Sequence, residues 1–249
     1  MDPAHVCPAC GSQRVRATVL GTERTAEELG RAFAQFRVRT SWGEKVLDSV
    51  PDEPAIIVAT PGAEPSVAGG YGAAVLLDVW ALLQRPDLRA TEDTFAKWLQ
   101  AAALVRPHSA GGEVVVVADP ALPIVQHLIR WDVVGHAALE LAHRKDARFP
   151  PAVHIAVVDA PRHALEDFFD HVELPEHAEV LGPVDLPAGV TLPGEWDVPR
   201  FGQAQRMLVR SPLRGRTELG RALRAGAVHR AARKQTLPLR IQVNPIDVG

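Results

Sequence analysis

Two adjacent prolines, Pro150-Pro151, separate two parts of the sequence that have different patterns. Proline has no backbone N–H to donate and restricts the residue before it, here Phe149, so a helix does not continue through this point. The helical pattern that runs through His136 to Arg144 therefore ends before Phe149. A domain boundary is predicted here, with one domain over residues 17–148 and another over residues 149–249.

Short apolar segments alternate with helical patterns in the first of these domains. The capping-box pattern Thr25-Ala-Glu-Glu28 predicts a helix that runs to about Phe36, and residues 91–104 have helical spacing with Phe95 and Trp98 on one face. Apolar strands are predicted at residues 16–21, 36–39, 56–59, 73–77 and 113–118. Continuous apolar strands that alternate with helices indicate a parallel sheet covered on both faces, so an α/β fold is expected.

The second domain has a different order of elements. Strands are predicted at residues 153–158, before 183, at 207–210 and at 239–243, with helices at 163–171 and 217–233 and a loop rich in proline and glycine over 187–202. The order is β-α-β-β-α-β, which is typical of a small α+β sandwich of ferredoxin-like or related topology.

The composition describes an ordinary soluble globular protein of one or two domains. The chain has 249 residues, of which 47% are hydrophobic and 23% are charged. No segment approaches the run of about 18 apolar residues that a membrane helix needs. The first 30 residues also lack the pattern of a secretory signal. We therefore expect a cytoplasmic protein.

Positive charge is concentrated at the end of the chain. Residues 200–249 contain eleven Lys and Arg residues against Glu218 and Asp247, a balance of +9, whereas the formal charge of the whole chain is −3. A basic segment of this kind favours a polyanionic partner. The alternative is an Arg-rich helix that is simply exposed to solvent, because arginine also serves as a general surface residue.

The two cysteines lie together in Cys7-Pro-Ala-Cys10-Gly11. A CxxC turn followed by glycine is typical of a zinc knuckle, in which two thiolates converge on one tetrahedral ion. A closed structural site needs four ligands, so Cys7 and Cys10 are predicted to form half of a zinc site that holds the metal poorly in this chain alone. A thioredoxin-like redox role is disfavoured, because the polar residues after Gly11 do not begin a helix. The simplest explanation is that partner cysteines lie upstream of Met1.

The tryptophans and one glycine cluster are also candidate binding residues. Trp42, Trp80, Trp98, Trp131 and Trp196 could stack on bases, but core packing is predicted for Trp80 and Trp98, whose neighbours are apolar. Trp196, in a polar loop near the basic segment, remains a candidate for stacking. Gly69, Gly70 and Gly72 are predicted to form a turn rather than a phosphate cradle, because no Lys-Ser/Thr follows them.

The order of several short motifs along the chain resembles the C-terminal half of the PriA (primosomal protein N′) family. The Gly-Thr-Glu motif with its following helix and the Leu-Gly-Pro-Val motif carry most of this resemblance. The matching segments are Cys7-Pro-Ala-Cys-Gly11, Gly21-Thr-Glu-Arg-Thr-Ala-Glu-Glu-Leu29, Val75-Leu-Leu-Asp78, Asp87-Leu-Arg-Ala-Thr-Glu92, Gly112-Glu-Val-Val115, Phe149-Pro-Pro151, Val180-Leu-Gly-Pro-Val184 and Asn244-Pro-Ile-Asp247.

This resemblance implies a role for each part of the chain. Residues 1–16 would be a partial zinc-binding knuckle with ligands Cys7 and Cys10, residues 17–148 a degenerate second RecA-like helicase lobe, and residues 149–249 a small DNA-binding C-terminal domain. The family's first RecA-like lobe, which carries the nucleotide-phosphate loop, has no counterpart in this sequence. The implied partners are forked or single-stranded DNA and other primosome proteins.

Two departures from the family pattern concern ATP chemistry. Active members follow the strand at residues 56–59 with Gly-Thr-Gln and Lys-Gly-His motifs that couple DNA to ATP, but here the sequence continues as Thr60-Pro61-Gly62. The two arginine-finger positions fall on Leu104 and Pro107, with Arg106 out of register by one residue. Loss of an arginine finger removes a factor of about 10³ to 10⁵ in rate. No catalytic residue is therefore assigned.

Three functional interpretations follow. The first is a replication-restart primosome component that binds DNA at stalled forks and helps to load the replicative helicase without unwinding DNA itself. In it, phosphate contacts without base specificity come from Arg206, Arg210, Arg214, Arg216, Arg221 and Arg224. The second is a fragment of a working ATP-dependent 3′–5′ DNA helicase. The third is an α/β protein that recruits partners without nucleic acid.

Overall fold

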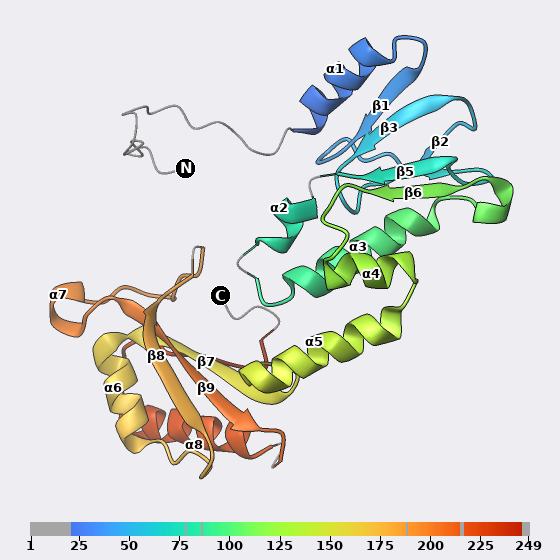
Figure 1. Ribbon diagram of the computed structural model, residues 1–249. Helices are drawn as coiled ribbons and strands as arrows, with labels where there is room; N and C mark the ends of the chain where they lie inside the picture. The colour runs from blue at the N-terminus through green and yellow to red at the C-terminus, as the bar shows by residue number, and fades with distance from the viewer. Residues whose placement is uncertain (1–20, 78, 86, 188, 215–216, 246–249) are drawn as a thin grey trace, which may run out of the picture. The chain divides into compact units, whose positions relative to one another are not determined.

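A computed structural model describes residues 21–245 except 78, 86, 188 and 215–216 (Figure 1). The chain divides into two compact units, and each is described by itself. The first unit contains the described residues up to 85 and from 90 to 131, and the second contains residues 87–89 and those from 132 onward. Among the described helices, none is long and apolar enough to cross a membrane.

Among its described residues, the first unit contains one helix, then five short strands, two helices, a sixth strand and a last helix. Its helices are α1 (Thr22–Ala32), α2 (Val79–Leu83), α3 (Ala90–Ala103) and α4 (Pro123–Ile129), with a 3-10 turn η1 (His108–Ala110). Its strands are β1 (Arg37–Ser41), β2 (Ser49–Val50), β3 (Ala55–Ala59), β4 (Ser66–Val67), β5 (Ala73–Leu76) and β6 (Glu113–Val116). The described strands form three parallel pairs, which are β1–β3, β2–β4 and β5–β6. Parallel pairing agrees with the α/β prediction.

The core of this unit packs on one face of β5–β6. Phe95 and Trp98 of α3 form a buried cluster with Ile124, Val125 and Leu128 of α4, against which Leu76 and Val116 pack. The opposite face carries Val75, Leu77, Val115 and Val117, which are 48–55% exposed. Among the described residues, therefore, this strand pair is covered on one face, whereas the apolar runs predicted cover on both.

The second unit begins with helix α5 (Val133–Ala147) and continues as a β-α-β-β-α-β fold. The elements are β7 (Val153–Pro161), α6 (Arg162–His171), β8 (Glu179–Asp185), β9 (Ala204–Pro212), α8 (Glu218–Ala232) and β10 (Arg240–Val243), with a short helix α7 (Val198–Phe201) before β9. The sheet order is β10-β7-β9-β8, and every neighbouring pair is antiparallel. This is the predicted ferredoxin-like order of elements.

Helices α6 and α8 pack on one face of this sheet (Figure 1). Alternate residues of β7, Ala156, Val158 and Ala160, point toward them, because side chains alternate between the faces of a strand. Phe168 of α6 and Leu223 of α8 complete a core whose members are at most 3% exposed. Gly226 allows the two helices to approach, since a Cβ atom there would lie 2.9 Å from Phe168 and 3.0 Å from Val172.

Two details differ from the sequence predictions. Helix α1 begins at Thr22 rather than Thr25, because Gly21 is its N-cap and accepts the Thr25 N–H, so the capping box is not used. Trp80 is 42% exposed rather than in the core, whereas Trp98 is buried as predicted. The compact units divide at residue 132, before α5, and the predicted domain boundary at residue 149 stays a prediction. Arg144 of α5 donates to the carbonyls of Leu88 and Pro150, which joins α5 to the second unit.

The two glycines of α8 predict opposite effects of alanine. Gly220→Ala should raise the free energy of unfolding by about 0.5–1 kcal/mol through helix propensity, because nothing lies within 4 Å of the new Cβ atom. Gly226→Ala should lower it by about 1–3 kcal/mol, because the new methyl group overpacks the contact with Phe168. Urea unfolding of both variants measures the difference, and equal effects would show that α6 and α8 do not pack this closely.

Candidate nucleic-acid interface

The arginines predicted to contact DNA lie on two elements of the second unit. Arg206 and Arg210 belong to β9, Arg214 follows that strand, and Arg221 and Arg224 belong to α8. Arg216 lies outside the described residues. The structure thus brings five of the predicted residues into one unit, but their surroundings differ.

Arg206 is buried at the centre of the sheet, where it forms an ion pair with Asp159. The register places it directly opposite Asp159 of β7. Its Nε donates to Asp159 Oδ1 at 2.8 Å and its Nη2 donates to Oδ2 at 3.0 Å, while the two side chains are 4% and 0% exposed. A bidentate pair of this kind satisfies both charged groups internally. Arg206 therefore connects β7 to β9, and its guanidinium is not at the surface.

Arg210 is engaged near the other end of β9. Its Nε donates to Glu179 Oε2 at 2.6 Å, and Arg148, which follows α5, pairs with the second carboxylate oxygen of Glu179. The hydrogen bond from Arg210, together with the Arg148 charge, lowers the pKa of Glu179 below its ordinary value. Two arginines thus share one carboxylate, which leaves a net positive charge at this end of the sheet.

Arg221 and Arg224 project from the exposed side of α8. They are one turn apart, and the opposite side of the helix is buried through Leu219, Leu223 and Gly226. The helix contains a single acidic residue, Glu218. Arg214, Arg221 and Arg224 are exposed and form no ion pair with the residues that the structure describes. These three residues, called the α8 cations below, are available to a polyanion.

Charge counting missed the structural use of other basic residues in this segment. Arg230 is 7% exposed and donates to the Leu237 carbonyl, and burial lowers its pKa while the Asp167 charge opposes that shift. Arg233 donates to Asp167 at 2.9 Å and contacts His171 Nε2 at 3.1 Å. The acids that engage Arg206, Arg210 and Arg233 precede residue 200, so a count over residues 200–249 does not include them.

Three further candidate sites have different outcomes. Cys7 and Cys10 lie outside the described residues, so the half-site for zinc stays a prediction. Within the part that the structure describes, no three His, Cys, Asp or Glu side chains gather as metal ligands. The Trp196 indole N–H donates to the Gly202 carbonyl at 3.0 Å, which holds the ring against its own loop.

The segment around Arg106, where the resemblance places the arginine-finger positions, is held by backbone contacts. Tyr71 N–H donates to the Leu104 carbonyl, and Arg106 N–H donates to the Tyr71 carbonyl. The Arg106 guanidinium lies beside Gly72, where a Cβ atom would be 3.3 Å from Nη2. Leu104 carries no charge and Pro107 no side-chain donor, so Arg106 is the cation of this segment.

Comparison with known proteins gives the class of the second unit. Residues 145–246 match the family model of the primosomal protein N C-terminal domain, so this part of the chain belongs to that family. Over its whole length, the chain is also similar to the C-terminal part of the replication restart protein PriA, as the sequence motifs predicted.

Three relatives show the extent of this similarity. The probable replication restart protein PriA of Mycobacterium tuberculosis (strain H37Rv) is 49% identical over 256 residues and that of Mycobacterium leprae is 48% identical over 243 residues, covering 100% and 98% of this chain. The replication restart protein PriA of Bacillus subtilis is 27% identical over 62% of it. The chain spans 39% and 37% of the two mycobacterial proteins and 21% of the Bacillus protein.

Arg206 should be needed for stability because of its buried pair. Arg206→Met should lower the free energy of unfolding by about 3–5 kcal/mol, since it leaves the Asp159 carboxylate buried without its partner. The double variant Asp159→Leu/Arg206→Met should recover most of that loss, because no charge remains buried. Urea denaturation tests both, with the exposed Arg224→Met as the matched control that should change stability by less than about 0.5 kcal/mol. Equal losses in the single and double variants would contradict this account of Asp159.

Proposed function

We propose that this chain is the DNA-binding and primosome-assembling C-terminal part of a replication restart protein in the cytoplasm. In this role it binds DNA at stalled forks and helps to load the replicative helicase, without unwinding DNA itself. The proposal is supported by the match of residues 145–246 to the primosomal protein N C-terminal domain and by the names of the relatives.

The exposed α8 cations are the observation that carries DNA binding. Arg221 and Arg224 extend from the same side of a helix whose other side is buried, and no described acid neutralises them. Guanidinium groups on an exposed helix surface suit phosphate oxygens, which carry no sequence information. We therefore expect binding through the phosphate backbone, with Arg206 and Arg210 acting through the sheet rather than on DNA.

The first unit supports the proposal of a degenerate RecA-like lobe. Its parallel pairs β1–β3 and β5–β6, with α2 and α3 between β5 and β6, agree with that architecture. A RecA-like motor needs arginines that stabilise the charge developing on the transferred phosphoryl group. Leu104 and Pro107 occupy those positions, and Arg106 lies against Gly72. This supports a lobe that does not complete an ATPase site.

Replacing both α8 arginines should weaken DNA binding in a salt-dependent way. Each phosphate contact with a single strand contributes roughly −0.7 to the slope of log K against log salt concentration. Arg221→Ala/Arg224→Ala should therefore make the slope about 1.4 less steep. Fluorescence anisotropy with a labelled oligonucleotide at several salt concentrations measures this. We prefer these substitutions to removal of residues 200–249, because that truncation would delete β9, α8 and β10.

Two matched controls make this experiment specific. Arg24→Ala/Arg31→Ala removes two exposed arginines from α1 of the first unit and should leave the slope unchanged. A sequence-scrambled oligonucleotide should bind like the original. If the α8 double variant binds as tightly as the unmodified chain at every salt concentration, the α8 cations are solvent-exposed residues without a role in DNA binding.

ATP hydrolysis should be absent. A fusion of the N-terminal part of a mycobacterial relative to this chain should release no phosphate above background when DNA is added, because the positions expected to stabilise the transition state hold Leu104 and Pro107. Phosphate release is measured with and without a forked substrate. Turnover of roughly 1 to 10³ per second that is lost on Arg106→Ala and retained on Arg130→Ala would show that Arg106 reaches the nucleotide and that the register is wrong.

A further inference from the structure

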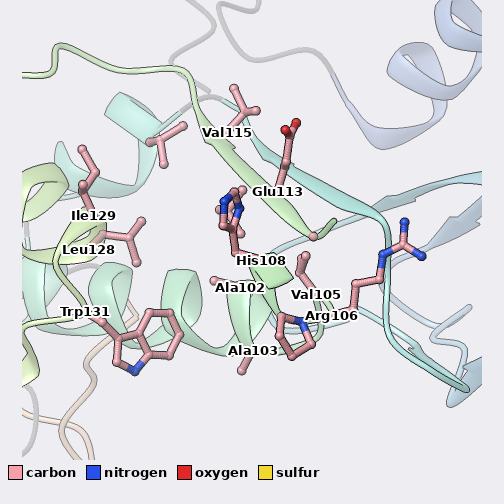
Figure 2. A pocket seen from close by; sticks show the side chains of 14 residues that line it. Ala102, Ala103, Val105, Arg106, His108, Glu113, Val115, Leu128, Ile129 and Trp131 are labelled. Atoms are coloured by element: carbon pink, nitrogen blue, oxygen red, sulfur yellow. The ribbon is translucent and has the colours of Figure 1, made fainter. Parts of the chain in front are cut away.

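A pocket of about 760 Å³ lies beside β6 in the first unit (Figure 2). Five consecutive residues from Gly112 to Val116 line it, although side chains alternate between the two faces of a strand. The pocket therefore follows the edge of β6 rather than one of its faces. The end of α3, the segment through His108, and the end of α4 with Trp131 form its other walls.

The edge of β6 that faces away from β5 carries backbone N–H and C=O groups that do not bond to β5. Glu113 N–H donates to the Gly72 carbonyl and Val117 N–H donates to the Leu76 carbonyl, so the odd-numbered residues of this strand bond to β5. In a parallel pair the intervening residues, Val114 and Val116, direct their N–H and C=O groups to the other side. Among the described strands, β6 pairs with β5 alone. An extended segment can add to such an edge.

The pocket wall opposite this edge is apolar and exposed. Ile129 is 67% exposed and Trp131 is 54% exposed, and both line the pocket with the buried Leu128. Trp131 has φ of 53°, a left-handed backbone conformation that is an outlier for a bulky residue. The indole lines the pocket, and in Figure 2 it lies on the same side as Leu128 and Ile129.

The charges at the rim complement an acidic partner. Arg106 and His108 are exposed beside the pocket, and Arg106 forms no ion pair with the described residues. Glu113 is the acid among the lining residues, and it lies in the part of β6 that is nearest to Gly72. A segment with carboxylates beyond its apolar residues would meet Arg106 and His108 at the rim.

We propose that this pocket binds an extended segment of a partner protein, which pairs with the edge of β6 and inserts an apolar side chain between Ile129 and Trp131. The segment alternates apolar with small polar residues and carries acidic residues at one end. Backbone hydrogen bonds supply part of the affinity and the pocket supplies selectivity for the inserted side chain. This site shares no residue with the α8 cations, so it does not depend on DNA binding.

The proposal is tested with a labelled eight-residue peptide in which valine alternates with threonine around a central phenylalanine and two glutamates form one end. The full chain should bind this peptide at least about tenfold more tightly than a scrambled peptide of the same composition, because scrambling moves the phenylalanine out of register with the pocket while the backbone pairs with β6. N-methylation of the alternate amides that would face β6 should abolish the difference, because those amides could no longer donate. Lysines in place of the two glutamates should also weaken binding.

Substitutions on the protein locate the site. Ile129→Glu and Trp131→Ala should each reduce the affinity for the alternating peptide by about tenfold or more, and both residues are exposed enough for the fold to tolerate the change. Val134→Glu, at a residue of α5 that is 81% exposed and does not line the pocket, is the matched control and should have no effect. Equal affinity for alternating and scrambled peptides, or unchanged binding by both pocket variants, would overturn the proposal.

Discussion

The ion pair between Asp159 and Arg206 is the constraint on which the second unit depends. Both side chains are buried at the centre of a four-stranded sheet, and each is the hydrogen-bonding partner that the other needs. Removing two charges from water is costly, so this pair contributes little net stability compared with apolar residues, but it favours one strand register over others. A shift of β9 by one residue along β7 would place Met207 opposite Asp159 and leave the carboxylate unpaired. The pair therefore specifies the register that positions every other residue of β9.

This pairing also determines which cations remain for a partner. Arg206, Arg210 and Arg233 are paired with acids from earlier in the chain, and Arg230 is buried against a backbone carbonyl. The positive field of the basic segment is consequently weaker and more local than a balance of +9 implies. Among the described residues of this segment, the exposed cations without an ion pair are Arg200, Arg214, Arg221, Arg224 and Lys234. The surface available to a polyanion thus depends on which cations lack an acidic partner, and the total number of arginines is less informative.

Element order was predictable from sequence because it depends on local signals. Continuous apolar runs, proline breaks and helical spacing identified β7, α6, β9 and α8 within a few residues, and their order predicted the sheet topology. The burial of Arg206 was not predictable, because it depends on cross-strand register with Asp159, forty-seven residues away. The exposure of Trp80 was missed for a similar reason, since apolar neighbours in sequence do not show what packs against a side chain in space.

The two units have chemically distinct surfaces. This difference bears on whether the chain acts as a scaffold or as part of a motor. A motor must stabilise charge on a nucleotide, and in the proposed RecA-like register Leu104 and Pro107 occupy the positions that would do so. A scaffold must instead hold nucleic acid and protein at separate places. The α8 cations suit phosphate, whereas the edge of β6 with Ile129 and Trp131 suits a polypeptide, and the two surfaces share no residue. Because the two surfaces belong to different compact units with separate cores, substitutions in one should not alter the other. In a scaffold, DNA binding and peptide binding should therefore be lost independently of each other. In a motor, both activities would depend on nucleotide.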